Sequence, residues 1–106
     1  MLFVTLEEFY ARAAQCVRLG RDAEVACAKR MAEGDAEARS ALIESYLPMT
    51  AGVVRRAKEP TLTLALYCTA ALERAVDTFD FSQESEDFTH RLSWHLRNAI
   101  AAYTVR

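Results

Sequence analysis

The sequence has few residues that interrupt a regular backbone, with three glycines and two prolines among 106 residues. Because glycine and proline are the commonest breakers of helices and strands, their scarcity allows long regular segments. Hydrophobic residues make up 52% of the chain and charged residues 26%, a balance typical of folded rather than disordered proteins. This length suits one domain, which we expect to span residues 1–106.

An excess of charge of one sign is also missing, since 13 basic residues balance 15 acidic ones to give a formal net charge of −2. A chain of this kind is not drawn to nucleic acid by its overall field. Any role on DNA must therefore come from a local patch of cations.

Long apolar runs are absent as well. No stretch of about 18 apolar residues occurs, and residues 1–8, MLFVTLEE, lack the basic segment and apolar run of a signal peptide. We therefore expect a cytoplasmic protein without a membrane partner.

Residues that could perform catalysis or bind a metal are few and scattered. Cys16, Cys27 and Cys68 lie far apart, without the close pairs that bind zinc, and we expect reduced thiols. His90 and His95 are five positions apart on one expected helix, so their side chains point in different directions. With no nucleophile motif or phosphate-binding glycine loop, the sequence predicts no enzyme, no cofactor and no metal site.

Apolar residues instead repeat at helical spacing along the chain, which predicts an all-α fold, a compact bundle of about five helices. Thr5 opens a T-L-E-E capping box for a first helix within residues 1–20, and Gly20 stops that helix. Asp22 is expected to cap the second helix, which ends at Gly34, and Asp35 to cap the third.

The third expected helix runs from about 36 to 58 and contains Pro48. Proline removes a backbone hydrogen bond and clashes with the preceding turn, so we expect a kink or break near residues 44–48. The fourth and fifth helices are expected over about 62–77 and 87–103. The apolar stripes of these helices predict a core composed of Phe9, Leu42, Tyr46, Leu72, Val76, Phe79, Phe88, Leu92, Leu96 and Ala99.

The fifth expected helix carries the only tryptophan of the chain, Trp94. A helical wheel places Trp94 opposite the stripe of Phe88 and Leu92, between Arg91 and Asn98. A large aromatic residue outside the core usually contacts a partner, by stacking on a base or anchoring a protein. The alternative is that Trp94 packs on another helix of the same domain.

Three segments resemble motifs of the sigma-70 family of RNA polymerase sigma factors. Residues 28–44, AKRMAEGDAEARSALIE, resemble AKRxxEGDxEAxxxLIE; residues 71–80, ALERAVDTFD, resemble GLxxAVxxFD; and residues 88–100, FTHRLSWHLRNAI, resemble FSTYAxWWIRQAI. The resemblance implies that residues 25–103 form the helical core domain of that family, known as region 2.

That domain binds RNA polymerase with one surface and captures the promoter −10 element as single-stranded DNA with another. Matching positions imply that DNA is bound by Trp94, Arg97 and Asn98, with Arg91 and His95 standing where the family has a tyrosine and a second tryptophan. The polymerase-facing motif DLIQEGN is replaced by residues 63–69, TLALYCT, which have lost its acids and amide.

Three functions follow from these observations. In the first, the chain is a sigma-like transcription initiation protein that binds RNA polymerase weakly. A helix-turn-helix domain that reads DNA is then expected on a separate chain. Alternatively, it is a degenerate sigma-like module that binds a protein. In the third alternative it is a helical homodimer without DNA binding, whose seam is formed by Leu64, Leu66 and Tyr67.

Overall fold

The structure is a computed structural model that describes residues 2–82 and 87–105, and over these residues it is all-helical. The element bounds are α1 (Leu6–Gln15), α2 (Arg21–Ala32), α3 (Ala36–Ser45), α4 (Leu47–Arg55), α5 (Leu62–Thr78) and α6 (Phe88–Val105). The all-α prediction is confirmed. The expected count of five helices is wrong, because the described residues form six.

The additional helix comes from the break at Pro48. The expected third helix is two helices, since α3 ends at Ser45, α4 begins at Leu47, and Tyr46 turns the chain between them with φ −108° and ψ 4°. Pro48 lies in the first turn of α4, where its missing N–H removes no helical hydrogen bond. The proline thus starts a new helix instead of bending the old one.

The turn between α2 and α3 is formed by local hydrogen bonds. Gly34 has φ +97°, and the backbone N–H groups of Gly34 and Asp35 donate to the carbonyls of Met31 and Arg30 at 2.9 and 3.0 Å. This arrangement is a Schellman motif that closes α2. Asp35 then caps α3, because its Oδ1 accepts from the backbone N–H of Glu37 at 3.0 Å. The predicted roles of Gly34 and Asp35 are confirmed.

Two boundaries near the N-terminus differ from the prediction. Thr5 does cap α1, with its Oγ1 accepting from the backbone N–H of Glu8 at 3.0 Å, but α1 ends at Gln15 and not at Gly20. Gly20 is the N-cap of α2, and Asp22 lies inside its first turn. Asp22 therefore acts through the favourable interaction of an acid with the helix dipole, not as a cap.

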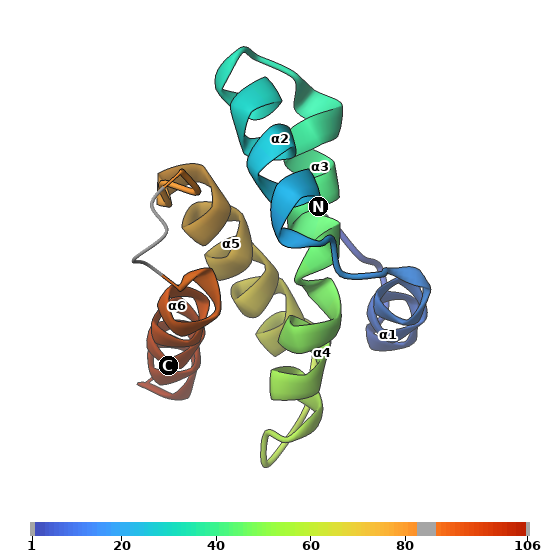
Figure 1. Cartoon of the computed structure of the whole chain (residues 1–106). Coiled ribbons are helices and arrows are strands. Elements are labelled where there is room, and N and C mark those ends of the chain that lie inside the picture. Colours follow the sequence, from blue (N-terminus) through green and yellow to red (C-terminus); the bar gives the residue numbers. More distant parts are fainter. Residues whose placement is uncertain (1, 83–86, 106) are drawn as a thin grey trace.

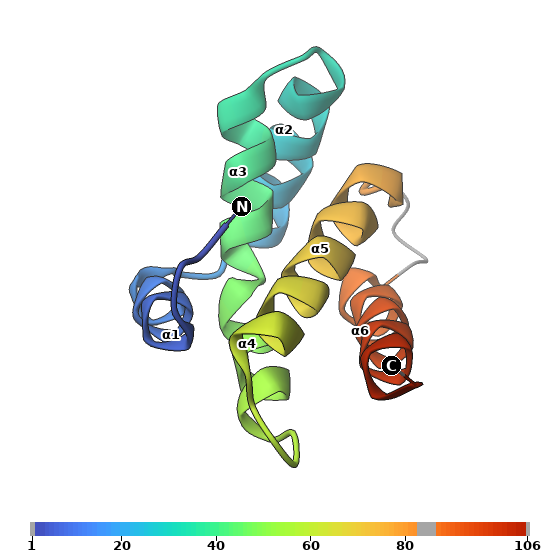
Figure 2. The same ribbon diagram turned by 180° about the vertical axis from the view of Figure 1, so that it is seen from behind.

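The helices surround α5, as Figures 1 and 2 show. The α2–α3 hairpin forms one end of the molecule, while α4 continues the line of α3 past α5. The first and last helices lie on opposite sides, with α1 packed on α4 and α5, and α6 packed chiefly on α5. One long side of α6 is consequently free of other described helices.

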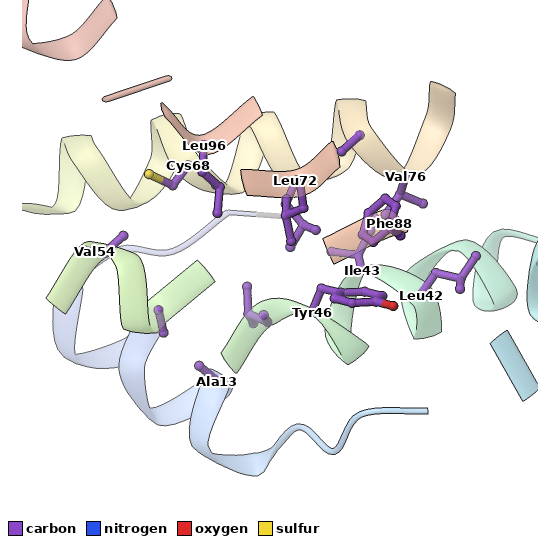
Figure 3. Packing of buried hydrophobic residues seen from close by; sticks show 14 of the residues in the cluster. Ala13, Leu42, Ile43, Tyr46, Val54, Cys68, Leu72, Val76, Phe88 and Leu96 are labelled. Carbon is purple, nitrogen blue, oxygen red and sulfur yellow. The ribbon is translucent and has the colours of Figure 1, made fainter. Parts of the chain in front are cut away.

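The predicted core is confirmed at nine of its ten positions, all of them buried; Ala99 is the exception and is half-buried. An aromatic cluster joins the helices at one end of this core. The rings of Tyr46 and Phe88 lie 4.5 Å apart between centroids, and Phe79 and Phe81 each contact Phe88 at 5.0 Å. Figure 3 shows Tyr46 and Phe88 packing together from the α3–α4 turn and the start of α6. The cluster fixes where α6 begins.

A buried polar group supports the same junction. Glu24 is 7% exposed and accepts a hydrogen bond from the hydroxyl of Tyr46, while the guanidinium of Arg18 lies 4.9 Å from the Tyr46 ring centroid. Burial, followed by the hydrogen bond to Glu24, raises the pKa of Tyr46 to about 12. The Tyr46 hydroxyl therefore stays protonated and keeps donating at physiological pH.

Candidate functional site

The residues that the sequence singled out on the last helix lie on the surface of α6. Trp94 has 51% of its surface exposed, and Arg91, Arg97 and Asn98 are also exposed. Trp94 follows Leu92 by two positions, which turns it about 200° away from the buried stripe. The prediction that Trp94 is partly exposed is confirmed, so its ring is not buried in a packing contact with another helix of the domain.

Trp94 borders a groove of about 650 Å³ between α5 and α6. The groove is lined by Leu66, Tyr67, Ala70, Ala71 and Arg74 from α5, and by Trp94, His95, Asn98, Ala99 and Ala102 from α6. We call it the α5–α6 groove. It brings together three of the predicted DNA-binding residues and two of the predicted partner-binding residues.

Small side chains create this hollow. Four of the ten lining residues are alanines, and an alanine side chain ends at Cβ, so the space above it stays open. Of the larger lining residues, Tyr67 packs on Tyr103, with 5.7 Å between the ring centroids and the planes at 74°. The groove thus combines small apolar side chains with the aromatic rings of Tyr67 and Trp94, a composition suited to a flat ring.

His95 stands edge-on to Trp94, with ring centroids 5.0 Å apart and planes at 87°. Its Nε2 is buried and has no hydrogen-bond partner among the described residues. Burial lowers the pKa of His95, and the neighbouring charges of Arg91 and Arg74 lower it further. His95 is therefore a neutral imidazole at neutral pH.

Among the residues that the structure describes, the charged side chains in the groove and along the exposed surface of α6 are cationic. No carboxylate is among the lining residues, and the sequence from 88 to 106 contains no aspartate or glutamate. Arg74 lines the groove, while Arg91 and Arg97 lie on the exposed surface of α6. The groove thus presents aromatic rings beside cations, a combination that suits the bases and phosphates of a nucleic acid.

The three predicted partner-binding residues on α5 differ in exposure. Leu66 and Tyr67 are half-buried and reach the groove. Leu64 is 2% exposed and belongs to the core, so its side chain is closed to a partner in this fold and its expected place in a seam is wrong. The helical step of about 100° per residue turns Leu66 about 200° away from Leu64, and the buried stripe of α5 that includes Leu64, Ala65 and Cys68 contains neither Leu66 nor Tyr67.

Two other hollows contain none of the predicted DNA-binding residues. One of about 1050 Å³ lies where α4 ends, with Arg56, Lys58 and Glu59 at its wall. The second, of about 740 Å³, lies beside the α2–α3 hairpin and includes Arg39 and Asp77, which already pair with each other at 2.7 Å. Both have walls of mixed charge, unlike the α5–α6 groove.

Arg74 and the four alanines are functional candidates that sequence reasoning missed. The lack of acids after Asp87 is visible in the sequence and could have marked the last helix as a cationic surface. The alanines give no such signal, because only the approach of α5 to α6 makes a hollow of them.

Over residues 2–82 and 87–105, no three histidine, cysteine or acidic side chains gather in a way that could hold a metal ion. Within the same residues, no helix combines the length and the apolar character that a membrane span requires. Comparison of the chain with models of known protein families and with curated protein sequences finds no match.

Proposed function

We propose that this protein is a sigma-like module that binds single-stranded DNA in the α5–α6 groove, with the bases of the promoter −10 element as its ligand. The observation that carries the proposal is the exposed Trp94 beside an apolar groove on a helix without acidic residues. Stacking on an exposed aromatic residue is the usual means of holding an unpaired base, and it requires no excess of positive charge over the whole chain.

The proposed contacts divide by chemistry. Trp94 stacks on one base, with the amide of Asn98 placed to meet a base edge one turn further along α6. Arg91 and Arg97 contact phosphates from the exposed surface of the helix. A duplex presents no free base faces to this surface, so single strands are preferred.

In this proposal the affinity for RNA polymerase is weak. The segment that would face polymerase, residues 63–69, places Leu64, Cys68 and Thr69 in the core and carries no charged side chain. Apolar groups cannot replace the charge-assisted hydrogen bonds of a polar contact. A helix-turn-helix subunit on a separate chain would supply additional DNA contacts.

A second candidate function uses the same groove to bind a protein, either a partner or a second copy of this chain. Leu66, Tyr67 and the alanines of the groove favour it, because they offer apolar area for a helix to cover. Such binding would depend little on salt, whereas DNA binding depends on it steeply. Salt dependence therefore separates the two functions.

The test is binding of a labelled oligothymidylate of about 12 nucleotides, a length within the usual site size of single-strand binders. Affinity is measured by fluorescence anisotropy over a range of salt concentrations, with a duplex of the same length for comparison. We expect tighter binding to the single strand and a fall in affinity with rising salt. Equal or no binding of the two DNAs, together with a dimer in sedimentation, would favour the protein-binding function.

Substitution of single arginines shows which of them contact phosphates. Replacing Arg97 with alanine should weaken binding and reduce the slope of log affinity against log salt by about 0.7, the value for one phosphate contact to a single strand. The matched control is Arg21→Ala, an exposed arginine at the start of α2 and outside the groove, which should leave the slope unchanged. Equal slopes for Arg97→Ala and the wild type would remove Arg97 from the interface.

A further inference from the structure

His95 is the one titratable group in the α5–α6 groove whose charge can change near neutral pH. Its ring borders the space beside Trp94, with 5.0 Å between the ring centroids. A base stacked on Trp94 would lie next to this imidazole, and the phosphates flanking that base would lie close to it. The negative charge of a bound strand would therefore act directly on the imidazole of His95.

The groups that face His95 are cationic or neutral. Arg91 precedes it by one turn on α6, and Arg74 faces it from α5, the helix on which α6 packs. Tyr67 is the other titratable side chain of the groove, and no carboxylate lines it. Among the described lining residues no acidic side chain offsets a positive charge on His95, and its Nε2 is buried without a hydrogen-bond partner among those residues.

We propose that His95 takes up a proton from solvent when an anionic strand occupies the α5–α6 groove, so that the groove binds single-stranded DNA more tightly in mildly acidic solution. The proposal rests on the proposed function, because the strand provides the negative charge. Phosphates beside Arg91 and Arg74 offset the repulsion that these arginines exert on an imidazolium.

The sign of the effect follows from linkage. In the free protein the pKa of His95 is lowered, first by burial and then by Arg91 and Arg74, whereas in the complex the phosphates raise it. Since the complex holds the proton more tightly than the free protein does, affinity increases as the pH falls toward the pKa of the complex. A rise of one pKa unit on binding corresponds to a gain of up to about tenfold.

The test compares the affinity for oligothymidylate at pH 8 and pH 6 at constant ionic strength, in the wild type, His95→Gln and His90→Gln. Glutamine retains an amide donor and acceptor but does not titrate in this range. His90 is the only other histidine and is exposed one turn earlier on α6, so it is the matched control. We expect a gain of several-fold at pH 6 in the wild type and in His90→Gln, and its loss in His95→Gln.

An equal gain in His95→Gln and the wild type would overturn the proposal, as would wild-type binding that does not change with pH. If the protein binds no oligothymidylate at pH 8 or at pH 6, the proposed function is overturned as well. Failure of the proposed function is thus distinguishable from failure of the His95 proposal alone. Calorimetric titration of the wild type in two buffers of different ionisation enthalpy counts the protons taken up and requires no variant. A count of zero contradicts the proposal even if His95→Gln does not fold.

Discussion

Leu92 is a buried residue of α6 that helps to fix this helix, and with it Trp94, against the core. It lies two positions before Trp94 on α6, and none of its surface is exposed. Replacing Leu92 with alanine removes buried methyl groups and leaves a cavity, which should lower the free energy of unfolding by about 2–5 kcal/mol. Urea denaturation followed by far-UV circular dichroism measures this change.

The control for that experiment is Leu2→Ala, because Leu2 is 88% exposed. A substitution away from the core should change stability by less than about 0.5 kcal/mol. An effect of that small size for Leu92→Ala would place its side chain on the surface and would contradict the packing of α6 on α5.

At the scale of residues, the sequence predicts burial well and proximity poorly. Helical spacing alone predicts that Leu92 and Phe88 belong to the core, and both are buried. Helical spacing within one helix does not show which residues of another helix lie across from it. The sequence therefore does not predict that Arg74 of α5 and His95 of α6 line the same groove. The burial of Leu64 differs from its expected place in a seam because the helix turns the members of a run of neighbouring apolar residues to different sides.

At the scale of elements, the turn between α2 and α3 depends on one backbone angle. Gly34 has φ +97°, a conformation that other residues rarely adopt, although nothing lies within 4 Å of where its Cβ would be. Gly34→Ala should therefore destabilise the protein by about 1–2 kcal/mol through backbone strain alone, with no steric clash. Urea denaturation of the variant measures this cost.

Gly20 provides the matched comparison, because its Cβ position is also open while its φ is −74°. Gly20→Ala should be nearly neutral, since the loss of freedom in the unfolded chain offsets a weaker N-cap. Equal effects of the two substitutions would show that the positive φ of Gly34 is not what the turn requires.

Element boundaries were predictable where a local rule decided them. The Asp35 cap and the break before Pro48 depend only on neighbouring residues, and both are present. The cap expected at Asp22 failed because the chain between α1 and α2 enters the second helix already at Gly20. In that linker the backbone N–H of Leu19 donates to Ser45 at 2.9 Å, a contact across the fold that no local pattern reveals.

At the scale of the whole molecule, the fold separates charges that nearly cancel over the chain. The formal net charge is −2, yet α6 contains cations and no acids. Figure 1 shows α6 on the opposite side of the molecule from α1, whose first turn is acidic. An approaching strand therefore meets arginines without acids along α6, which favours its arrival there.

The α5–α6 groove itself belongs to this largest scale, and that explains why the sequence did not predict it. Leu66 and Tyr67 are separated from Trp94 and His95 by nearly 30 positions, and only the packing of α6 against α5 brings them to one hollow. The motif of residues 88–100 that resembles sigma factors lies on α6 alone. The structure adds the residues of α5 that face α6 across the groove, and none of the described lining residues is a carboxylate.

Trp94 allows the central proposal to be tested directly, because it is the only tryptophan of the chain and its fluorescence reports on the groove alone. Adding oligothymidylate should quench its emission as a base stacks on the ring. Trp94→Ala should bind the strand about 1–3 kcal/mol more weakly, and Trp94→Phe, which keeps an aromatic face, should lose less. Emission unchanged by the strand, together with equal affinities of Trp94→Ala and the wild type, would contradict binding of single-stranded DNA at this groove.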